Sequence, residues 1–233
     1  MARTKPKSTR NFLLRIILRV CLTFAAILIL ATGITLLQVW WLASHNPETT
    51  SWMRMRQRQA KEAKKTLVVK HSWVSLTSLP KSVSQAVIAA EDDQFFQHDG
   101  FDWDAIRKAR AQNEKSGRIK RGGSTITQQL AKNLYLSPER SYIRKAREGV
   151  ITAVMEWLLP KPRILELYLN SIEFGPGVFG VEEGARYHFG VSAKRLTLEQ
   201  SCKLAAIIPA PLRYKVTGPY VTRRAQRIQR MIG

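Results

Sequence analysis

An uncharged apolar segment near the start of the chain constrains the fold more than any other feature. No Asp, Glu, Lys or Arg occurs between residues 20 and 42, and about 20 apolar helical residues are enough to cross a bilayer core of about 30 Å. The segment therefore predicts a transmembrane helix at residues 20–42. A cleaved signal peptide or a buried core helix would also be apolar, but this run is longer than a usual signal-peptide core.

Basic residues on both sides of this segment predict its orientation. The charged side chains of the first 19 residues are all cations, namely Arg3, Lys5, Lys7, Arg10, Arg15 and Arg19. Because positively charged flanks stay in the cytoplasm, we expect residues 1–19 to be a basic cytoplasmic leader and the rest of the chain to lie across the membrane. Residues 43–66 are also rich in cations, which weakens the asymmetry and indicates a basic stalk lying on lipid headgroups.

Length and charge limit what the remainder can be. The chain has 233 residues, with 38 Lys and Arg against 17 Asp and Glu, a formal net charge of +21. That length allows one anchor and one globular domain, and the charge favours nucleic acid, anionic lipid or a phosphorylated substrate as partner. Cys21 lies in the apolar segment and Cys202 in a late helical segment, which argues against a disulfide between them.

Beyond a short strand-like stretch at residues 67–74, the apolar spacing is mostly helical. The predicted helices cover residues 82–91, 103–113, 125–133, 143–159, 162–170, 178–189 and 197–208. Pro160 and Pro162 break the long fourth helix and allow a restart, and Thr197 followed by Gln200 is the pattern of a capping box. We therefore expect a mainly α domain at residues 67–233.

Three consecutive acids, Glu91 to Asp93, end the first predicted helix of this domain. Neighbouring like charges and a partly apolar setting both raise the pKa of a carboxyl group, which favours one that takes up a proton near neutral pH. The competing interpretation is an ordinary solvated acidic turn.

A Gly-rich stretch then enters a helix whose first turn is rich in hydroxyl groups, from Gly122 to Asn133. The N-terminus of such a helix offers free N–H groups and a positive dipole end to an anion. Lys132 lies about two turns after Ser124, where its ammonium could reach the same phosphate. A well-capped structural helix would have the same pattern.

A third cluster places Arg140, Arg144 and Lys145 before Glu148. On residue types alone this cluster could equally be a surface salt bridge.

Together and in this order, the motifs resemble the peptidoglycan glycosyltransferase family, whose members occur alone or as the first catalytic domain of bifunctional penicillin-binding proteins. The resemblance covers roughly residues 79–214. Its motifs are Glu91-x-x-x-Phe95-x-x-His98-x-Gly100, the run from Gly123 to Asn133, Arg144-Lys145-x-x-Glu148, Lys161-x-x-Ile164-Leu165-Glu166-x-Tyr168-Leu169-Asn170 and Gly175-x-Gly177-x-x-Gly180. It implies a lysozyme-like helical domain behind the anchor, in the periplasm of a bacterial inner membrane.

The resemblance also implies an activity. Such enzymes polymerise lipid II into β-1,4-linked glycan strands by inverting transfer, release polyprenyl diphosphate, are inhibited by moenomycin, and have no transpeptidase activity when they occur alone. Glu91 would deprotonate the 4-hydroxyl group of the acceptor sugar. Glu148 would assist on the diphosphate side, directly, through the nearby cations, or through a divalent metal such as Mg²⁺.

The remaining site residues follow from the same motifs. Those that would stabilise the departing diphosphate are Lys132, Arg140, Arg144 and Lys145, and those that would bind or orient the donor are Ser124, Thr125, Gln128 and Gln129. His98 is a further candidate for substrate binding, although a histidine bonded within its own turn would fit the motif equally well. Val154 and Met155 stand where family members often carry a cation. The implied partners are lipid II, the growing strand, the membrane and possible cell-wall synthesis or division proteins, without nucleic acid.

Other signals point elsewhere and are set aside. Gly175-x-Gly177-x-x-Gly180 fits a dinucleotide fingerprint but is predicted to follow a helix instead of a strand. The C-terminal arginines are expected to form a solvated or lipid-facing stripe; they are Arg223, Arg224, Arg227 and Arg230. A strand-cleaving enzyme of similar shape would need no diphosphate clamp, and a basic binding protein would need no buried Glu91 or Glu148.

Overall fold

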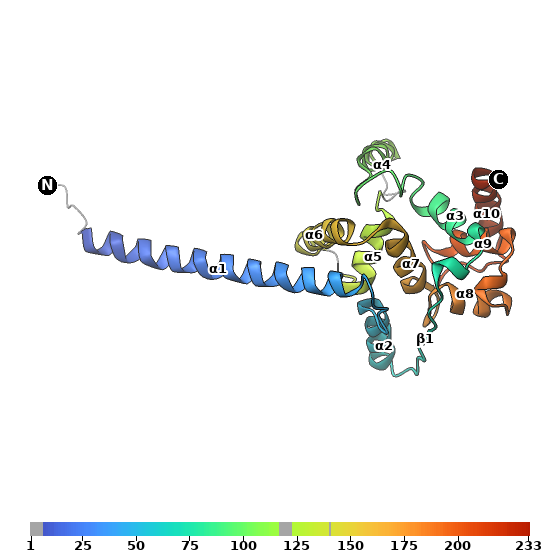
Figure 1. Ribbon diagram of the computed structural model, residues 1–233, viewed down its shortest axis with the longest axis horizontal. Helices are drawn as coiled ribbons and strands as arrows, with labels where there is room; N and C mark the ends of the chain where they lie inside the picture. Colours follow the sequence, from blue (N-terminus) through green and yellow to red (C-terminus); the bar gives the residue numbers. More distant parts are fainter. Residues whose placement is uncertain (1–6, 117–122, 140) are drawn as a thin grey trace.

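The computed structural model describes residues 7–116, 123–139 and 141–233, so the predicted site residue Arg140 lies outside the described residues. This part of the chain contains ten α-helices, which confirms the mainly α class (Figure 1). They are α1 (Lys7–Trp41), α2 (Ser51–Glu62), α3 (Lys81–Glu91), α4 (Trp103–Ser116), α5 (Ile126–Tyr135), α6 (Tyr142–Leu158), α7 (Lys161–Ser171), α8 (Val181–Phe189), α9 (Leu198–Ile207) and α10 (Pro219–Ile232). Two short 3₁₀ turns, η1 (Leu76–Ser78) and η2 (Ala193–Arg195), connect them.

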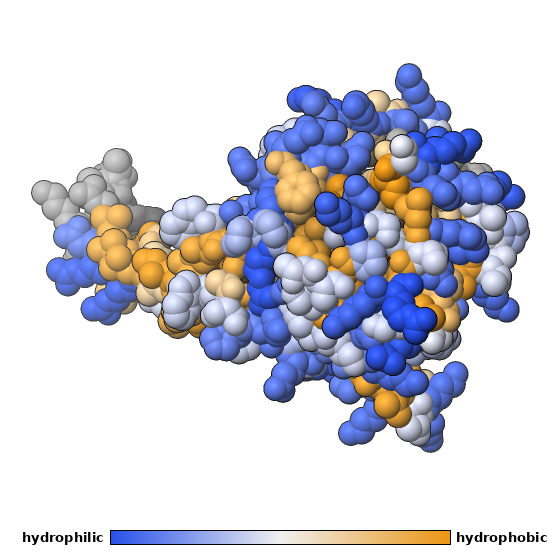
Figure 2. Space-filling view, turned by 45° about the vertical axis from the view of Figure 1, so that its right-hand side comes forward, coloured by the Kyte–Doolittle hydropathy of each residue, from blue (hydrophilic) through white to orange (hydrophobic). Residues whose placement is uncertain are grey.

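Helix α1 extends away from the globular part as one long rod (Figure 1). It begins within the basic leader, and its segment Asn11–Trp41 is long and apolar enough to cross a membrane. The most apolar part of that segment is not covered by the rest of the protein, and Figure 2 shows it as an apolar band leading to a mainly hydrophilic body. These features fit a single-pass membrane anchor.

The far end of α1 is packed against the globular part. Val39 is fully buried, and Leu42 is 2% exposed. Arg163 at the start of α7 donates hydrogen bonds to the carbonyl oxygens of Leu42 and His45, both at 2.8 Å. The anchor therefore enters the domain through a fixed contact.

Helix α2 lies within the predicted stalk and is also packed on the domain. Thr50 caps it by accepting a hydrogen bond from the Met53 N–H at 3.1 Å, and the Met53 side chain is buried. The Arg56 guanidinium binds both carboxylate oxygens of Glu173, with Nη2 to Oε2 at 2.7 Å, and Trp52 Nε1 donates to the same carboxylate at 3.3 Å. One face of this basic helix is thus fixed to residues more than a hundred positions later.

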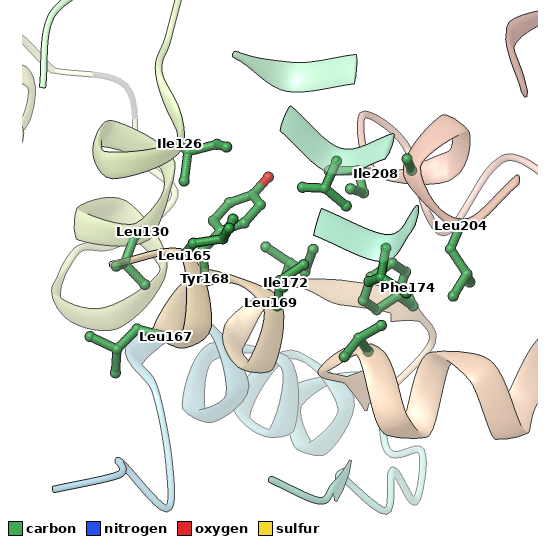
Figure 3. Close-up of a cluster of buried hydrophobic side chains, with 14 of the residues drawn as sticks. Ile126, Leu130, Leu165, Leu167, Tyr168, Leu169, Ile172, Phe174, Leu204 and Ile208 are labelled. Carbon is green, nitrogen blue, oxygen red and sulfur yellow. The ribbon is translucent and has the colours of Figure 1, made fainter. Parts of the chain in front are cut away.

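The core forms where α5 packs on α7 and where α3, α9 and α10 pack on one another. In Figure 3, Ile126 and Leu130 of α5 face Leu165 and Tyr168 of α7, and all four side chains are buried. The apolar residues of α5 and α7 recur at helical spacing, so each helix turns one stripe inward. This pairing holds the N-terminus of α5 next to the end of α3.

A small three-stranded sheet in the order β1-β3-β2 corrects two expectations. The strand predicted at 67–74 is reduced to β1 (Lys70–His71), which pairs in parallel with β3 (Val178–Phe179). The helix predicted from residue 178 starts only at Val181, because β3 and Gly180, whose φ is 80°, precede it. A positive φ favours glycine and interrupts a right-handed helix.

The glycine motif also differs from expectation, because Gly175 ends strand β2 (Glu173–Gly175). That strand pairs antiparallel with β3, whereas a dinucleotide site needs a parallel strand–helix–strand unit. The motif therefore belongs to a hairpin that leads into α8.

Several local predictions are confirmed. Thr197 and Gln200 form the predicted capping box at the start of α9. Helix α6 ends before Pro160, and α7 restarts at Lys161. Both cysteines are free.

Candidate active site

Glu91 lies at the last position of α3, where residues from three other helices surround its carboxylate. Gln129 Nε2 of α5 donates to Oε2 at 3.0 Å, and Arg224 Nη2 of α10 binds Oε1 at 3.0 Å. Tyr168 of α7 donates its hydroxyl proton to Gln129 Oε1 at 2.9 Å, which orients the amide. The Glu91 side chain is 10% exposed, so the carboxylate is fixed yet still reachable.

This environment raises the pKa of Glu91 above its ordinary value. Burial is the largest cause, since it disfavours the charged form, and the nearby charge of Asp92 acts in the same direction. The hydrogen bond from Gln129 and the positive charge of Arg224 oppose the rise. Glu91 therefore combines a raised proton affinity with two donors that support its ionised form.

The contact of Arg224 corrects the prediction of a uniform C-terminal stripe. Its side chain is 22% exposed and also donates to the carbonyl oxygen of Ala90 at 3.2 Å. Arg223, Arg227 and Arg230 of the same helix are exposed, as predicted. Arg224 differs because α10 packs against α3 and α9, which places its guanidinium beside Glu91.

Asp92 connects the end of α3 to the start of α5. Its Oδ2 accepts a hydrogen bond from the Ile126 N–H at 2.9 Å, and its Oδ1 is 2.9 Å from His98 Nε2. His98 Nδ1 accepts from the Gly100 N–H at 3.1 Å. Both ring nitrogens of His98 thus have partners within the motif, which fits the interpretation that His98 shapes this turn.

Asp92 gives a stability prediction. Replacing Asp92 with Ala would leave the buried Ile126 N–H without its acceptor and His98 without its carboxylate. An unsatisfied buried donor costs about 1–3 kcal/mol, so we expect Asp92→Ala to lower the free energy of unfolding by about that amount. Thermal unfolding of the detergent-solubilised full chain measures it. Exposed Asp93, the adjacent acid, is the matched control: Asp93→Ala should change little, and equal losses in both variants would contradict the assignment.

The start of α5 places the predicted donor-binding residues in different settings. Thr125 and Gln128 form a capping box and are 2% and 4% exposed. Ser124, just before the cap, is exposed. The capping box confirms the alternative of a well-capped helix at this motif, and Thr-x-x-Gln is the same pattern that identified Thr197 and Gln200.

The second carboxylate, Glu148 of α6, lies among cations. It is 3% exposed and accepts a hydrogen bond from Arg144 Nη1 at 2.6 Å and another from Lys145 Nζ. The pKa of Lys132 is lowered by burial and by the charges of Arg144 and Lys145, while Glu148 and, more weakly, Glu91 act against that shift. Lys132 on α5 is therefore within electrostatic range of both glutamates.

A cavity of about 400 Å³ brings the second and third motifs together. It lies between α4 and the N-terminus of α5 and reaches α6. Its lining includes Ser124, Gln128 and Lys145, so predicted donor-binding and diphosphate-binding residues face one space.

The predicted ligand for a divalent metal is a single carboxylate, Glu148. Among the described residues no cluster of three or more His, Cys, Asp or Glu side chains is placed to hold an ion. Both oxygens of Glu148 are bound by Arg144 and Lys145. Since Mg²⁺ needs only one or two carboxylates when substrate phosphates supply further oxygens, these residues fit an ion carried by a diphosphate but not a site made by protein alone.

Comparison with known proteins gives consistent matches over most of the chain. A family model described as Transglycosylase matches residues 55–232. A biosynthetic peptidoglycan transglycosylase of Azoarcus sp. (strain BH72) is 48% identical over 193 residues, covering 82% of this chain and 84% of the relative. Proteins of the same name from Aromatoleum aromaticum and Bordetella pertussis are 44% and 43% identical, covering 91% and 97% of this chain and 92% and 97% of their own lengths.

Proposed function

The chain belongs to the transglycosylase family and is a glycosyltransferase, and on this premise we propose that it polymerises lipid II into the β-1,4-linked glycan strands of peptidoglycan. The transfer inverts the anomeric centre and releases polyprenyl diphosphate, and the chain has no transpeptidase activity. The observation that carries this proposal is a pair of glutamates, Glu91 at 10% side-chain exposure and buried Glu148, that both interact electrostatically with Lys132.

On the acceptor side, Glu91 is the general base. It takes the proton from the 4-hydroxyl group of the acceptor GlcNAc as that oxygen forms a bond to the anomeric carbon of the growing strand. The raised pKa of Glu91 lies closer to the pKa of the acceptor hydroxyl group, and this makes Glu91 a stronger base toward that hydroxyl. Gln129 and Arg224 hold the carboxylate in one orientation, so no reorganisation is needed at the moment of transfer.

On the opposite face, the bond between the anomeric carbon and the diphosphate oxygen breaks. Inversion requires a base on one face and help for the leaving group on the other. We assign that help to Lys132, Arg144 and Lys145, together with Arg140 from the sequence motif. Glu148 positions Arg144 and Lys145 through its two short contacts. The developing charge on the diphosphate is where fixed cations stabilise the transition state most.

A divalent metal, if the reaction uses one, would have Glu148 as its protein ligand and would add positive charge to the diphosphate. Polymerisation assays with a chelator, and with the chelator followed by Mg²⁺, test this directly. If polymer is lost with the chelator and recovered with Mg²⁺, a metal supplies part of the positive charge that stabilises the departing diphosphate. If the amount of polymer is unchanged, the protein cations alone supply that charge.

Ser124, Gln128 and Gln129 orient the donor in this proposal, and Thr125 acts with them by capping α5. The proposed arrangement is a cytoplasmic leader at 1–19, a membrane span at 20–42, a basic stalk at 43–66 and a periplasmic domain at 67–233 of a bacterial inner-membrane protein. A substrate with a polyprenyl tail stays in the bilayer, so an anchored domain meets both its donor and its acceptor there. Cell-wall synthesis or division proteins are proposed as further partners.

Two incubations and one nucleic-acid binding assay separate this function from its rivals. Lipid II supplied to the full chain in detergent should yield polymer, and finished glycan should be left intact. Cleavage of finished glycan would indicate a strand-cleaving enzyme, and salt-sensitive nucleic-acid binding without turnover would indicate a basic binding protein.

The cations assigned to the departing diphosphate, which we call the clamp, are Lys132, Arg140, Arg144 and Lys145. They give a separate prediction. Lys132→Ala and Arg144→Ala should each weaken binding of lipid II, or of the family inhibitor moenomycin, by about tenfold, because one charge-assisted hydrogen bond contributes about 1.5 kcal/mol. Titration by fluorescence anisotropy measures it. Lys203, which pairs with Glu199 on the surface of α9, provides the control variant Lys203→Ala. Unchanged affinity in both clamp variants would remove the clamp from the mechanism.

A further inference from the structure

A second cavity, of about 550 Å³, lies apart from Glu91, between α2, the connection from α5 to α6 and the first turns of α6. We call it the stalk groove. Its lining includes four arginines, Arg54 and Arg58 from α2 and Arg144 and Arg147 from α6, against the two carboxylates Glu62 and Glu139. The groove therefore has an excess of positive charge.

The stalk groove adjoins the end of the membrane helix. Tyr135 lines it, and the Tyr135 hydroxyl donates to the carbonyl oxygen of Gln38 in α1 at 3.3 Å. Trp40 and Trp41 in the last turn of α1 are 65% and 44% exposed, and exposed tryptophans at the end of a span mark the level of the lipid headgroups. Helix α2 turns away from the direction of α1 at this level (Figure 1).

Three of the four arginines have no carboxylate partner within the described parts of the chain. Arg144 is bound to Glu148. Arg54 donates only to the Ser51 hydroxyl at 3.3 Å, and no described carboxylate forms an ion pair with Arg58 or Arg147. Arg54 and Arg58 are four residues apart, so their side chains leave the same face of α2. Trp52 and Arg56, each two residues from Arg54 and so on the opposite face, are bonded to Glu173, which fixes that orientation.

We propose that the stalk groove binds the phosphate headgroup of an anionic membrane phospholipid. Arginine is suited to this because its planar guanidinium binds phosphate oxygens in pairs and is always charged. A lipid held there would fix the height and tilt of the domain above the bilayer through α2, whose other face is bonded to Glu173. The groove shares Arg144 with the cations assigned to the diphosphate, so the proposal rests on Arg54, Arg58 and Arg147 and does not depend on the polymerising activity.

The test uses the full chain in detergent and three lipids, phosphatidylglycerol, phosphatidylcholine and lipid II, with bound lipid measured by native mass spectrometry. Each cation near a lipid surface contributes about a fivefold factor. The wild-type chain should therefore prefer phosphatidylglycerol, and Arg54→Gln with Arg58→Gln should reduce that preference by about tenfold or more. Lys194→Gln with Arg195→Gln removes the same charge from exposed positions of η2 and should leave the preference unchanged.

Two results would overturn the proposal. One is a double α2 variant that keeps the same preference for phosphatidylglycerol as the η2 control. The other is a double α2 variant that loses affinity for lipid II alone, because the groove would then serve the substrate diphosphate. Circular dichroism of both variants checks that the fold is retained. Because the binding measurement needs no turnover, its result can be interpreted even if the chain fails to polymerise lipid II.

Discussion

Replacing Glu91 with Gln is expected to abolish polymerisation of lipid II, with a loss of at least about 100-fold in rate, because general-base catalysis contributes about 10²–10⁴-fold. The amide has nearly the shape of the carboxyl group but cannot take up the proton of the acceptor hydroxyl. Gel analysis of glycan made from labelled lipid II measures the effect. Binding of lipid II should persist, since the diphosphate contacts lie around Glu148.

The fold should survive this change. The raised pKa of Glu91 means that the protein environment disfavours the ionised carboxylate relative to water. A neutral amide at this position avoids that desolvation free energy. The melting temperature of the Glu91→Gln variant at neutral pH should not fall by more than a few degrees. Glu199→Gln, the same change at an exposed position paired with Lys203, is the control. Substantial polymer from Glu91→Gln would remove Glu91 from the catalytic role.

The elements that local sequence determines were predictable. Proline pairs, apolar periodicity and cap residues act over a few positions, and they correctly located most helices from α3 to α9 and the capping box at Thr197. The anchor follows from bilayer thickness and hydropathy alone. Glu91 and Glu148 were identified through ordered motifs; the Glu148 side chain is buried beside the predicted Arg144 and Lys145, and the Glu91 side chain is 10% exposed beside Gln129 and Arg224, neither of which was predicted as its partner. Their chemical roles remain proposals.

What sequence reasoning missed depends on contacts between distant segments. Arg224 lies three residues after Val221 and four before Ile228, so helical spacing places it beside the buried stripe of α10, but nothing in the sequence identifies its partner, 133 positions earlier. Helix α2 looks like a stalk because most of its residues are polar, yet Arg56 and Trp52 converge on Glu173, more than a hundred residues later. The hairpin at 173–179 is too short for strand periodicity to show. Tertiary packing decided all three.

Losing Arg224 is the second change with a large expected effect. The groups that act on the pKa of Glu91 are Gln129 from α5, Arg224 from α10 and the neighbouring Asp92, in addition to burial, and Lys132 from α5 lies within electrostatic range. Burial and Asp92 raise the pKa of Glu91, and Arg224 is the cation in direct contact that opposes the rise. Without it, the carboxyl group should hold its proton to higher pH.

The direction of the effect follows from the role of Glu91 as a base. Only the ionised carboxylate can accept the proton, so the rate rises with pH through the pKa of Glu91, and Arg224→Gln should move this acidic limb to higher pH. A hydrogen bond to a charged group contributes about 1.5–3 kcal/mol, which corresponds to about a ten- to hundredfold loss of rate on the acidic side. The loss should become smaller as the pH is raised.

That recovery distinguishes electrostatic positioning from simple disruption of the fold. Arg224→Lys keeps a cation and should restore part of the wild-type profile, whereas Arg227→Gln removes the same charge from an exposed position one turn later on α10 and should leave the profile unchanged. Rates measured from pH 5 to pH 9 with saturating lipid II are sufficient. An Arg224→Gln enzyme that loses activity equally at every pH would show that Arg224 supports the packing of α10 against α3 and does not tune Glu91.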